Sequence, residues 1–362
     1  SLHEWCTGEL DNFLVFVLPV DNTPVMRKLF TGLCIDRTAE ARCSVNLMKI
    51  FWRLAGVLVL AVLVFAVAGV IATWAPDRSV QQLSVRWAPA PSQFVEVNGM
   101  QVHVRDEGPR DDPVPIVLLH GTSASLHTWD GWVEGLKGQR RVIRFDLPGF
   151  GLTGPSPTQD YSIAAYVQFV AALTHQLGVK KFDLAGNSLG GQIAWACAYA
   201  MPERVGKLVL VDSAGYPLQP VSIPIGFRIA RMPVLKNLME YVLPRGIVAS
   251  SVRNLYGDPG KVTPELVDRY FDMTLRAGNR SALSSRLEQV TYGSASEIKA
   301  LQLPTLIIWG GRDRLITPDH ALRFQTDIAG ARLVVFEGLG HVPHEEDAMA
   351  TLKPVRDFLK TR

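Results

Sequence analysis

A serine stands among closely spaced glycines in the segment Gly186-Asn187-Ser188-Leu189-Gly190-Gly191. The apolar run at residues 182–185 precedes it and predicts a strand, and a helical pattern follows it. A serine on a tight turn between strand and helix projects its hydroxyl, and glycines such as Gly186 and Gly190 let the two elements pass closely. We therefore interpret Ser188 as a candidate nucleophile.

A serine hydroxyl is a weak nucleophile until a base takes its proton, so the hypothesis requires a histidine and an acid. Asp313 follows the predicted strand at residues 305–309, and His341 follows the predicted strand at residues 332–336. Both would lie on loops at the same end of consecutive strands, where they can converge on Ser188. We expect His341 to act as the base and Asp313 to orient it.

Two other residues could take these roles. Asp212 ends the predicted strand at residues 207–211 and could serve as the acid. His344 comes three residues after His341 but is further from the strand end. We favour Asp313 and His341 over both.

The remaining component would be an oxyanion hole, a pair of N–H donors for the charge that develops on the substrate oxygen. The segment His120-Gly121-Thr122 follows the predicted strand at residues 115–119. The backbone N–H groups of Thr122 and Leu189 are the predicted donors. His120 is expected to hold its loop, and Asp146 to fix a turn beside the site.

Together these motifs, with the turn at residues 146–151, resemble the α/β-hydrolase superfamily, in the branch of esterases, lipases, C–C bond hydrolases and haloalkane dehalogenases. The resemblance covers about residues 94–360 and implies a Ser/His/Asp triad, no cofactor and a lid over the pocket. Dehalogenases and epoxide hydrolases of this superfamily use an aspartate nucleophile, so Ser188 disfavours those activities. Asn187 is similar to the residue before the serine in C–C bond hydrolases.

Apolar runs alternate with helical segments along the chain, which predicts a mostly parallel, eight-stranded sheet with helices on both faces. We expect this core at residues 94–214 and 304–362. Residues 215–303 contain helical patches, at 234–242 and 264–276, but no convincing strand. They are predicted to form an inserted helical lid over the site.

The stretch from Leu54 to Ala75 carries no charge and is long enough to cross a bilayer, so we expect a single-pass signal anchor at residues 48–75. Lys49 and Arg53 precede it, which places the catalytic domain on the extracytoplasmic, periplasmic side. The alternative is a signal peptide cleaved after Ala68.

The segments around the span carry no predicted function. Met48 begins a sequence typical of a native signal anchor, so residues 1–47 are interpreted as an extension of doubtful authenticity. Residues 76–93 contain several prolines and are predicted to be a linker between membrane and domain.

Composition excludes several classes of function. The net charge of +3 and the lack of a long basic run disfavour a nucleic-acid partner. No C-x-x-C pair or histidine cluster has the spacing of metal ligands, so we expect neither metal nor redox cofactor. Cys197 lies in an apolar run and is interpreted as a buried residue.

These observations lead to one hypothesis and two alternatives. The chain is expected to cleave a carboxylic ester through an acyl-enzyme, with a small-molecule or lipid-derived substrate that has an apolar acyl chain. The first alternative is a C–C bond hydrolase that uses the same triad. The second is a catalytically silent binding module, which the intact triad disfavours.

Overall fold

The computed structural model describes residues 37–232, 240–292 and 294–360, and the chain divides into two compact units, Ser1–Ile71 and Ala72–Arg362. The described part of the first unit is helix α3 (Arg37–Ala72). It begins before the expected start at Met48, and its segment Met48–Ala72 is long and apolar enough to cross a membrane.

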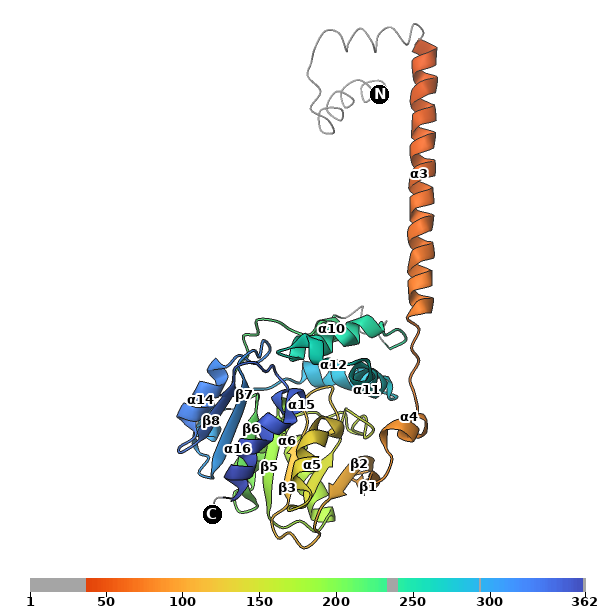
Figure 1. Cartoon of the computed structure of the whole chain (residues 1–362). Coiled ribbons are helices and arrows are strands. Elements are labelled where there is room, and N and C mark those ends of the chain that lie inside the picture. The colour runs from red at the N-terminus through yellow and green to blue at the C-terminus, as the bar shows by residue number, and fades with distance from the viewer. Residues whose placement is uncertain (1–36, 233–239, 293, 361–362) are drawn as a thin grey trace. The chain divides into compact units, whose positions relative to one another are not determined.

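The second unit is built on an eight-stranded sheet in the order β1-β2-β4-β3-β5-β6-β7-β8 (Figure 1). β2 is antiparallel to β1 and β4, and every other pair is parallel, which confirms the mostly parallel sheet. The sheet has eight strands, as expected. Their bounds are β1 Gln93–Val97, β2 Met100–Glu107, β3 Ile116–Leu119, β4 Val142–Phe145, β5 Phe182–Asn187, β6 Val205–Val211, β7 Thr305–Gly310 and β8 Arg332–Phe336.

Helices cover both faces of the sheet, and the core forms a layer on each side. On β7, Ile307 and Trp309 belong to the layer under α6, α7 and α14, whereas Leu306 and Ile308 belong to the layer under α5 and α16. This alternation follows from the two-residue period of a strand. The helix bounds are α5 Asp130–Leu136, α6 Ile163–Gln176, α7 Leu189–Ala200, α14 Asp319–Asp327, α15 Pro343–Glu346 and α16 Ala348–Lys360.

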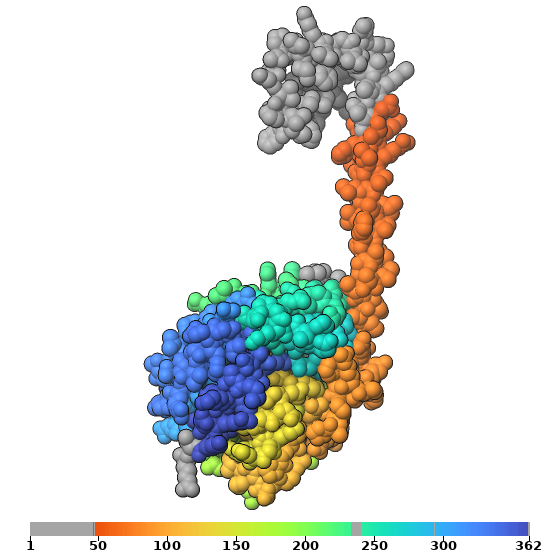
Figure 2. Space-filling view, viewed as in Figure 1, coloured from red at the N-terminus to blue at the C-terminus, as the bar shows by residue number. Residues whose placement is uncertain are grey.

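Between β6 and β7 the described residues form helices and loops but no strand, as expected for a lid. The predicted helix at residues 264–276 is α11, whereas most of the one predicted at 234–242 lies outside the described residues. On the face shown in Figure 2 the lid, coloured green to cyan, covers one end of the unit. Its helices are α8 Ile225–Ala230, α10 Arg245–Leu255, α11 Pro264–Leu275, α12 Asn279–Glu288 and α13 Ala295–Lys299.

The segment expected to be a linker is instead folded and bonded to the lid. It contains helix α4 (Val80–Trp87), which begins with a capping box at Ser79. Arg78 pairs with Asp272 of α11 at 2.7 Å, and the indole N–H of Trp87 donates to the same carboxylate at 2.9 Å. Asp272 therefore holds this segment against the lid.

Candidate active site

Ser188 occupies a strained turn between β5 and α7. Its φ of 57° and ψ of −117° lie in a region that side-chain-bearing residues rarely adopt. A Cβ on Gly186 would lie 2.1 Å from the Gly190 carbonyl oxygen, and one on Gly190 would lie 2.2 Å from that of Leu119. Only glycine fits at these two positions, so the sequence at the turn is set by the closeness of strand and helix.

Asp313 and His341 form a buried hydrogen-bonded pair at the ends of β7 and β8. His341 Nδ1 lies 2.7 Å from Asp313 Oδ2, and both side chains are at most 4% exposed. The other carboxylate oxygen accepts hydrogen bonds from the backbone N–H groups of Leu315 and Ile316, at 2.8 and 3.0 Å. Because Nδ1 is engaged, Nε2 is the ring nitrogen left to exchange a proton.

One cavity of about 350 Å³ brings the predicted site residues together. Ser188 and His341 both line it, with Asp313 behind the histidine. The Ser188 hydroxyl makes no hydrogen bond to His341 among the described residues. Such bonds are often long without substrate and tighten in the reacting complex.

The two predicted oxyanion donors border the same cavity. Thr122 and Leu189 both line it, and Leu189 is the first residue of α7. Within the described residues, neither backbone N–H donates a hydrogen bond to another group of the protein. Two unengaged N–H groups beside Ser188 are what an oxyanion would require.

Neither alternative residue replaces the expected pair. Asp212 lies next to it, but its Oδ1 accepts from the backbone N–H of Gly310 at 3.0 Å, and His341 bonds to Asp313 instead. His344 is fully buried against Trp129, with ring centroids 4.0 Å apart, and does not line the cavity. Burial lowers the pKa of His344 well below its usual value, which disfavours a role as base.

A family model described as the alpha/beta hydrolase fold matches residues 114–348. The chain belongs to this family. It is therefore a hydrolase of the α/β fold, as its strand order and its serine turn already indicate.

Individual relatives share most of this hydrolase's length. A 2-hydroxy-6-oxononadienedioate/2-hydroxy-6-oxononatrienedioate hydrolase of Burkholderia vietnamiensis is 31% identical, over 75% of this chain and 96% of its own. A meta-cleavage product hydrolase from Pseudomonas fluorescens is similar in structure, with a TM-score of 0.64 and 26% identity over 75% of this chain and 97% of its own. A bacterial membrane phospholipase A, 24% identical with a TM-score of 0.61 over 88% of this chain and 98% of its own, shares the fold.

Asn187 has a bridging position in this hydrolase that its sequence context did not reveal. Its side-chain amide donates to the backbone carbonyls of Val211 and His341, at 3.1 and 3.0 Å. The first bond joins the turn at Ser188 to β6, and the second joins it to the histidine loop. The side chain therefore holds nucleophile and base loops in register, a contact that only the folded chain creates.

His120 and Asp146 support loops around the hydrolase site. The Nδ1 of His120 is 2.8 Å from the Gly121 carbonyl, and its Nε2 accepts the backbone N–H of Leu147 at 2.9 Å. Asp146 is fully buried and accepts the backbone N–H of Leu126 at 2.7 Å. These bonds agree with the structural roles expected from the sequence.

The donor atoms of Asp212, Asp313 and His341 lie within 4.8 Å of one another, a set that could also hold a metal ion. Two of these groups are already engaged with each other, since His341 Nδ1 and Asp313 Oδ2 are at hydrogen-bond distance. Asp212 adds its bond from Gly310. Hydrogen bonds thus engage His341 Nδ1, Asp313 Oδ2 and Asp212 Oδ1.

Proposed function

We propose that this hydrolase cleaves a carboxylic ester through an acyl-enzyme formed on Ser188. The observation that carries the proposal is that the strained Ser188 shares one cavity with His341, which is bonded to Asp313. This arrangement supports the roles of nucleophile, base and orienting acid that acyl transfer needs.

The mechanism follows from these positions. His341 Nε2 takes the proton of Ser188 as the hydroxyl oxygen attacks the ester carbonyl, and the N–H groups of Thr122 and Leu189 stabilise the oxyanion. The C–O bond then breaks, and His341 gives the proton to the leaving alcohol. Water attacks the acyl-enzyme by the same steps in reverse, and Asp313 keeps the imidazole oriented throughout.

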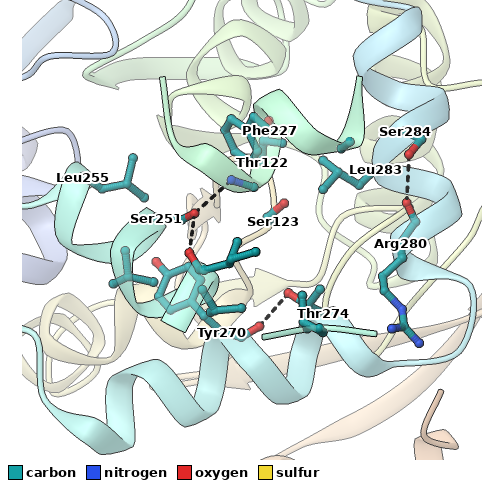
Figure 3. Close-up of a pocket in the computed structure, with 16 residues that line it drawn as sticks. Thr122, Ser123, Phe227, Ser251, Leu255, Tyr270, Thr274, Arg280, Leu283 and Ser284 are labelled. Carbon is teal, nitrogen blue, oxygen red and sulfur yellow. Dashed lines mark hydrogen bonds between the residues drawn. The ribbon is translucent and has the colours of Figure 1, made fainter. Parts of the chain in front are cut away.

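A second cavity, of about 100 Å³, lies under the lid and supports the proposal of an apolar acyl chain (Figure 3). The two cavities share four lining residues, so they adjoin at the site: Thr122, Phe227, Leu255 and Tyr270. Seven of the sixteen residues around the second cavity are aliphatic, among them Leu243, Ile247, Val248 and Leu283, and the others include serines, threonines and Arg280. Burying apolar chain there contributes about 0.8 kcal/mol per methylene.

We also propose that Met48–Ala72 anchors the hydrolase in a membrane as a single pass. The support is its length and apolar composition, since it contains one charged residue after Lys49, namely Arg53. These two cations favour a cytoplasmic N-terminal end and an extracytoplasmic catalytic unit. Recovery of the intact chain in carbonate-washed membranes would support the anchor, and release of a shortened chain would favour the cleaved signal peptide.

A C–C bond hydrolase is the second candidate. The Burkholderia vietnamiensis relative, at 31% identity, is a hydrolase of 2-hydroxy-6-oxononadienedioate, and the Pseudomonas fluorescens structure is a meta-cleavage product hydrolase. Asn187 is similar to the residue that precedes the nucleophilic serine in C–C bond hydrolases, which also supports this candidate. The same Ser188, His341 and Asp313 would attack the ketone of a vinylogous diketone, with a carbon leaving group.

The test uses the full-length chain in detergent and a fluorophosphonate probe, which labels activated serines. Labelling that disappears in Ser188→Ala, together with hydrolysis of p-nitrophenyl butyrate, supports the ester proposal. Labelling with turnover of a 2-hydroxy-6-oxo-dienoate and none of the ester favours the C–C candidate. A folded wild-type chain that is not labelled would point to a silent binding module.

A further inference from the structure

The cavity that contains Ser188 also contains a buried cation. Arg286, on lid helix α12, lines the cavity and is only 4% exposed. A second arginine, Arg231, lines the same cavity and is exposed. None of the described residues that line this cavity is an aspartate or glutamate. The lining therefore carries positive charge without a compensating carboxylate.

Arg286 has no partner of its own in the described part of the chain. Its guanidinium makes no hydrogen bond or ion pair there, and its Nε and Nη1 are buried without an acceptor. Tyr166 is the titratable group that acts on it electrostatically, but burial raises the pKa of this phenol, so it is neutral. The Tyr166 hydroxyl already donates to the Pro148 carbonyl.

Other buried arginines of this protein have carboxylate partners. Arg144, 3% exposed, pairs with Glu107 at 3.0 Å and also with Asp130. Arg280, 7% exposed, pairs with Asp77 at 2.6 Å. Each of these two arginines has a carboxylate partner, whereas Arg286 has none among the described residues. Of the three, only Arg286 lines the cavity of Ser188.

An unpaired buried charge is costly, and arginine does not escape the cost by losing its proton. Burial lowers the pKa of Arg286, but a guanidinium starts so high that it stays charged at neutral pH. Buried charges are ordinarily paired. A guanidinium that lines a cavity offers a planar fork of N–H donors that matches a carboxylate or phosphate, and the surrounding low dielectric strengthens that bond.

We propose that Arg286 binds an anionic group, a carboxylate or a phosphate, on the substrate that reacts at Ser188. The reaction part of this assignment rests on the proposed hydrolysis at Ser188, whereas the binding part does not. The apolar neighbours Leu287 and Val290 line the same cavity. The substrate class is therefore an amphiphile, with an apolar portion and one anionic end.

The first experiment compares p-nitrophenyl esters of six-carbon acids that differ at the far end: a free carboxylate (adipate), its methyl ester, and a phosphate monoester on 6-hydroxyhexanoate. Arg286→Met should lower kcat/KM for an anionic substrate by about 10- to 100-fold, the loss of a charge-assisted hydrogen bond, and leave the neutral methyl ester nearly unchanged. Arg286→Lys should retain part of the preference, because it keeps the charge and loses the fork.

Two controls separate charge, folding and position. Arg332→Met removes one exposed arginine at the start of β8 and should leave the preference intact. The neutral ester and fluorophosphonate labelling of Ser188 report whether Arg286→Met still folds. Because the anion could belong to the leaving group, a second pair of esters carries carboxylate or carbomethoxy on the phenol.

Binding without turnover gives a test that survives failure of the ester proposal. Hexanoate, hexyl phosphate and hexanol are titrated calorimetrically into full-length wild type and Arg286→Met. Weaker binding of one anion in the variant, with hexanol unchanged, supports the site and tells carboxylate from phosphate. Equal anion binding by both proteins, or equal loss for charged and neutral esters, would overturn the assignment.

Discussion

Asp212 and Asp313 place two carboxyl groups in one buried site, but only Asp313 is bonded to His341. Asp212 is fully buried, and its Oδ2 has no hydrogen-bond partner among the described atoms. Burial, and then the charge of Asp313, raise the pKa of Asp212 well above its usual value. His341 and two backbone N–H groups bond to Asp313, whereas the raised pKa of Asp212 favours its neutral form.

This arrangement predicts that Asp212 can replace Asp313 in part. Asp313→Asn removes the charge that disfavours ionisation of Asp212, so kcat/KM should fall by only about 10²-fold. The double variant Asp212→Asn/Asp313→Asn should fall by about 10⁴-fold, the loss typical of a triad without its acid. Steady-state kinetics on an ester checks both. Equal activity of the single and double variants would show that Asp212 contributes nothing.

Buried histidines predict that stability falls in acid. Burial lowers the pKa of His127 to about 3, and it lowers that of His344 as well. The unfolded chain takes up these protons near pH 6.5 while the folded chain does not, so stability is full above that pH and is lost below it. Each such histidine costs about 1.4 kcal/mol per pH unit in this range.

The variant His344→Phe removes one of these two buried histidines and so tests its contribution alone. The ring can keep its packing on Trp129, so stability at pH 7.5 should change little, whereas the loss between pH 6.5 and 5 should be smaller than in wild type. Urea unfolding at several pH values measures this slope. An unchanged slope would mean that His344 is protonated in the folded chain as readily as in the unfolded one.

The sequence predicted the sheet well because its central strands β3, β4, β5 and β7 are buried on both faces. Residues 116–119 are all apolar, and residues 182–187 are apolar or small except for Asp183 and Asn187. Asp313 and His341 follow such strands, so the sheet itself placed them. Residues whose surroundings come from distant segments could not be predicted in the same way.

Arg286 and the linker show where sequence reasoning stops. In α12 the residues NRSALSSRLE form no clear apolar face, and an arginine there is indistinguishable from an exposed one. Arg286 lines the cavity only because the folded lid places helix α12 beside it. The prolines at residues 76–93 suggested a tether, but Arg78 and Trp87 bond to Asp272, nearly two hundred residues later in the chain.

Strain at Ser188 predicts a conflict between stability and function. Glycine adopts a φ of 57° without penalty, so Ser188→Gly should be more stable than Ser188→Ala by about 1 kcal/mol, the strain relieved less the added chain entropy. Both variants lack the hydroxyl and should be inactive. Thermal unfolding of the two compares them directly. If Ser188→Ala were the more stable, the turn would not be strained.

The contacts of Asp272 lead to a prediction about residues 76–93, the segment that was expected to be a linker. It is 7% exposed and accepts hydrogen bonds from Arg78 and Trp87. Asp272→Asn should destabilise the second unit by about 1–3 kcal/mol, because the buried amide would lose the charge and turn its NH₂ towards one of these two donors. Detachment of residues 76–93 should also make them sensitive to limited proteolysis.

Asp268 provides the matched control on the same helix. Its carboxylate pairs with Arg245 at 2.6 Å and with Arg86 at 3.3 Å, but these side chains are between 35% and 51% exposed. Exposed ion pairs contribute little, so Asp268→Asn should change stability by less than about 1 kcal/mol and leave the segment protected. If the two variants behaved alike, burial at Asp272 would not be what holds the segment on the lid, and the order of residues 76–93 would depend on the backbone bonds from Arg78 to Leu275 and from Ala277 to Arg78 instead.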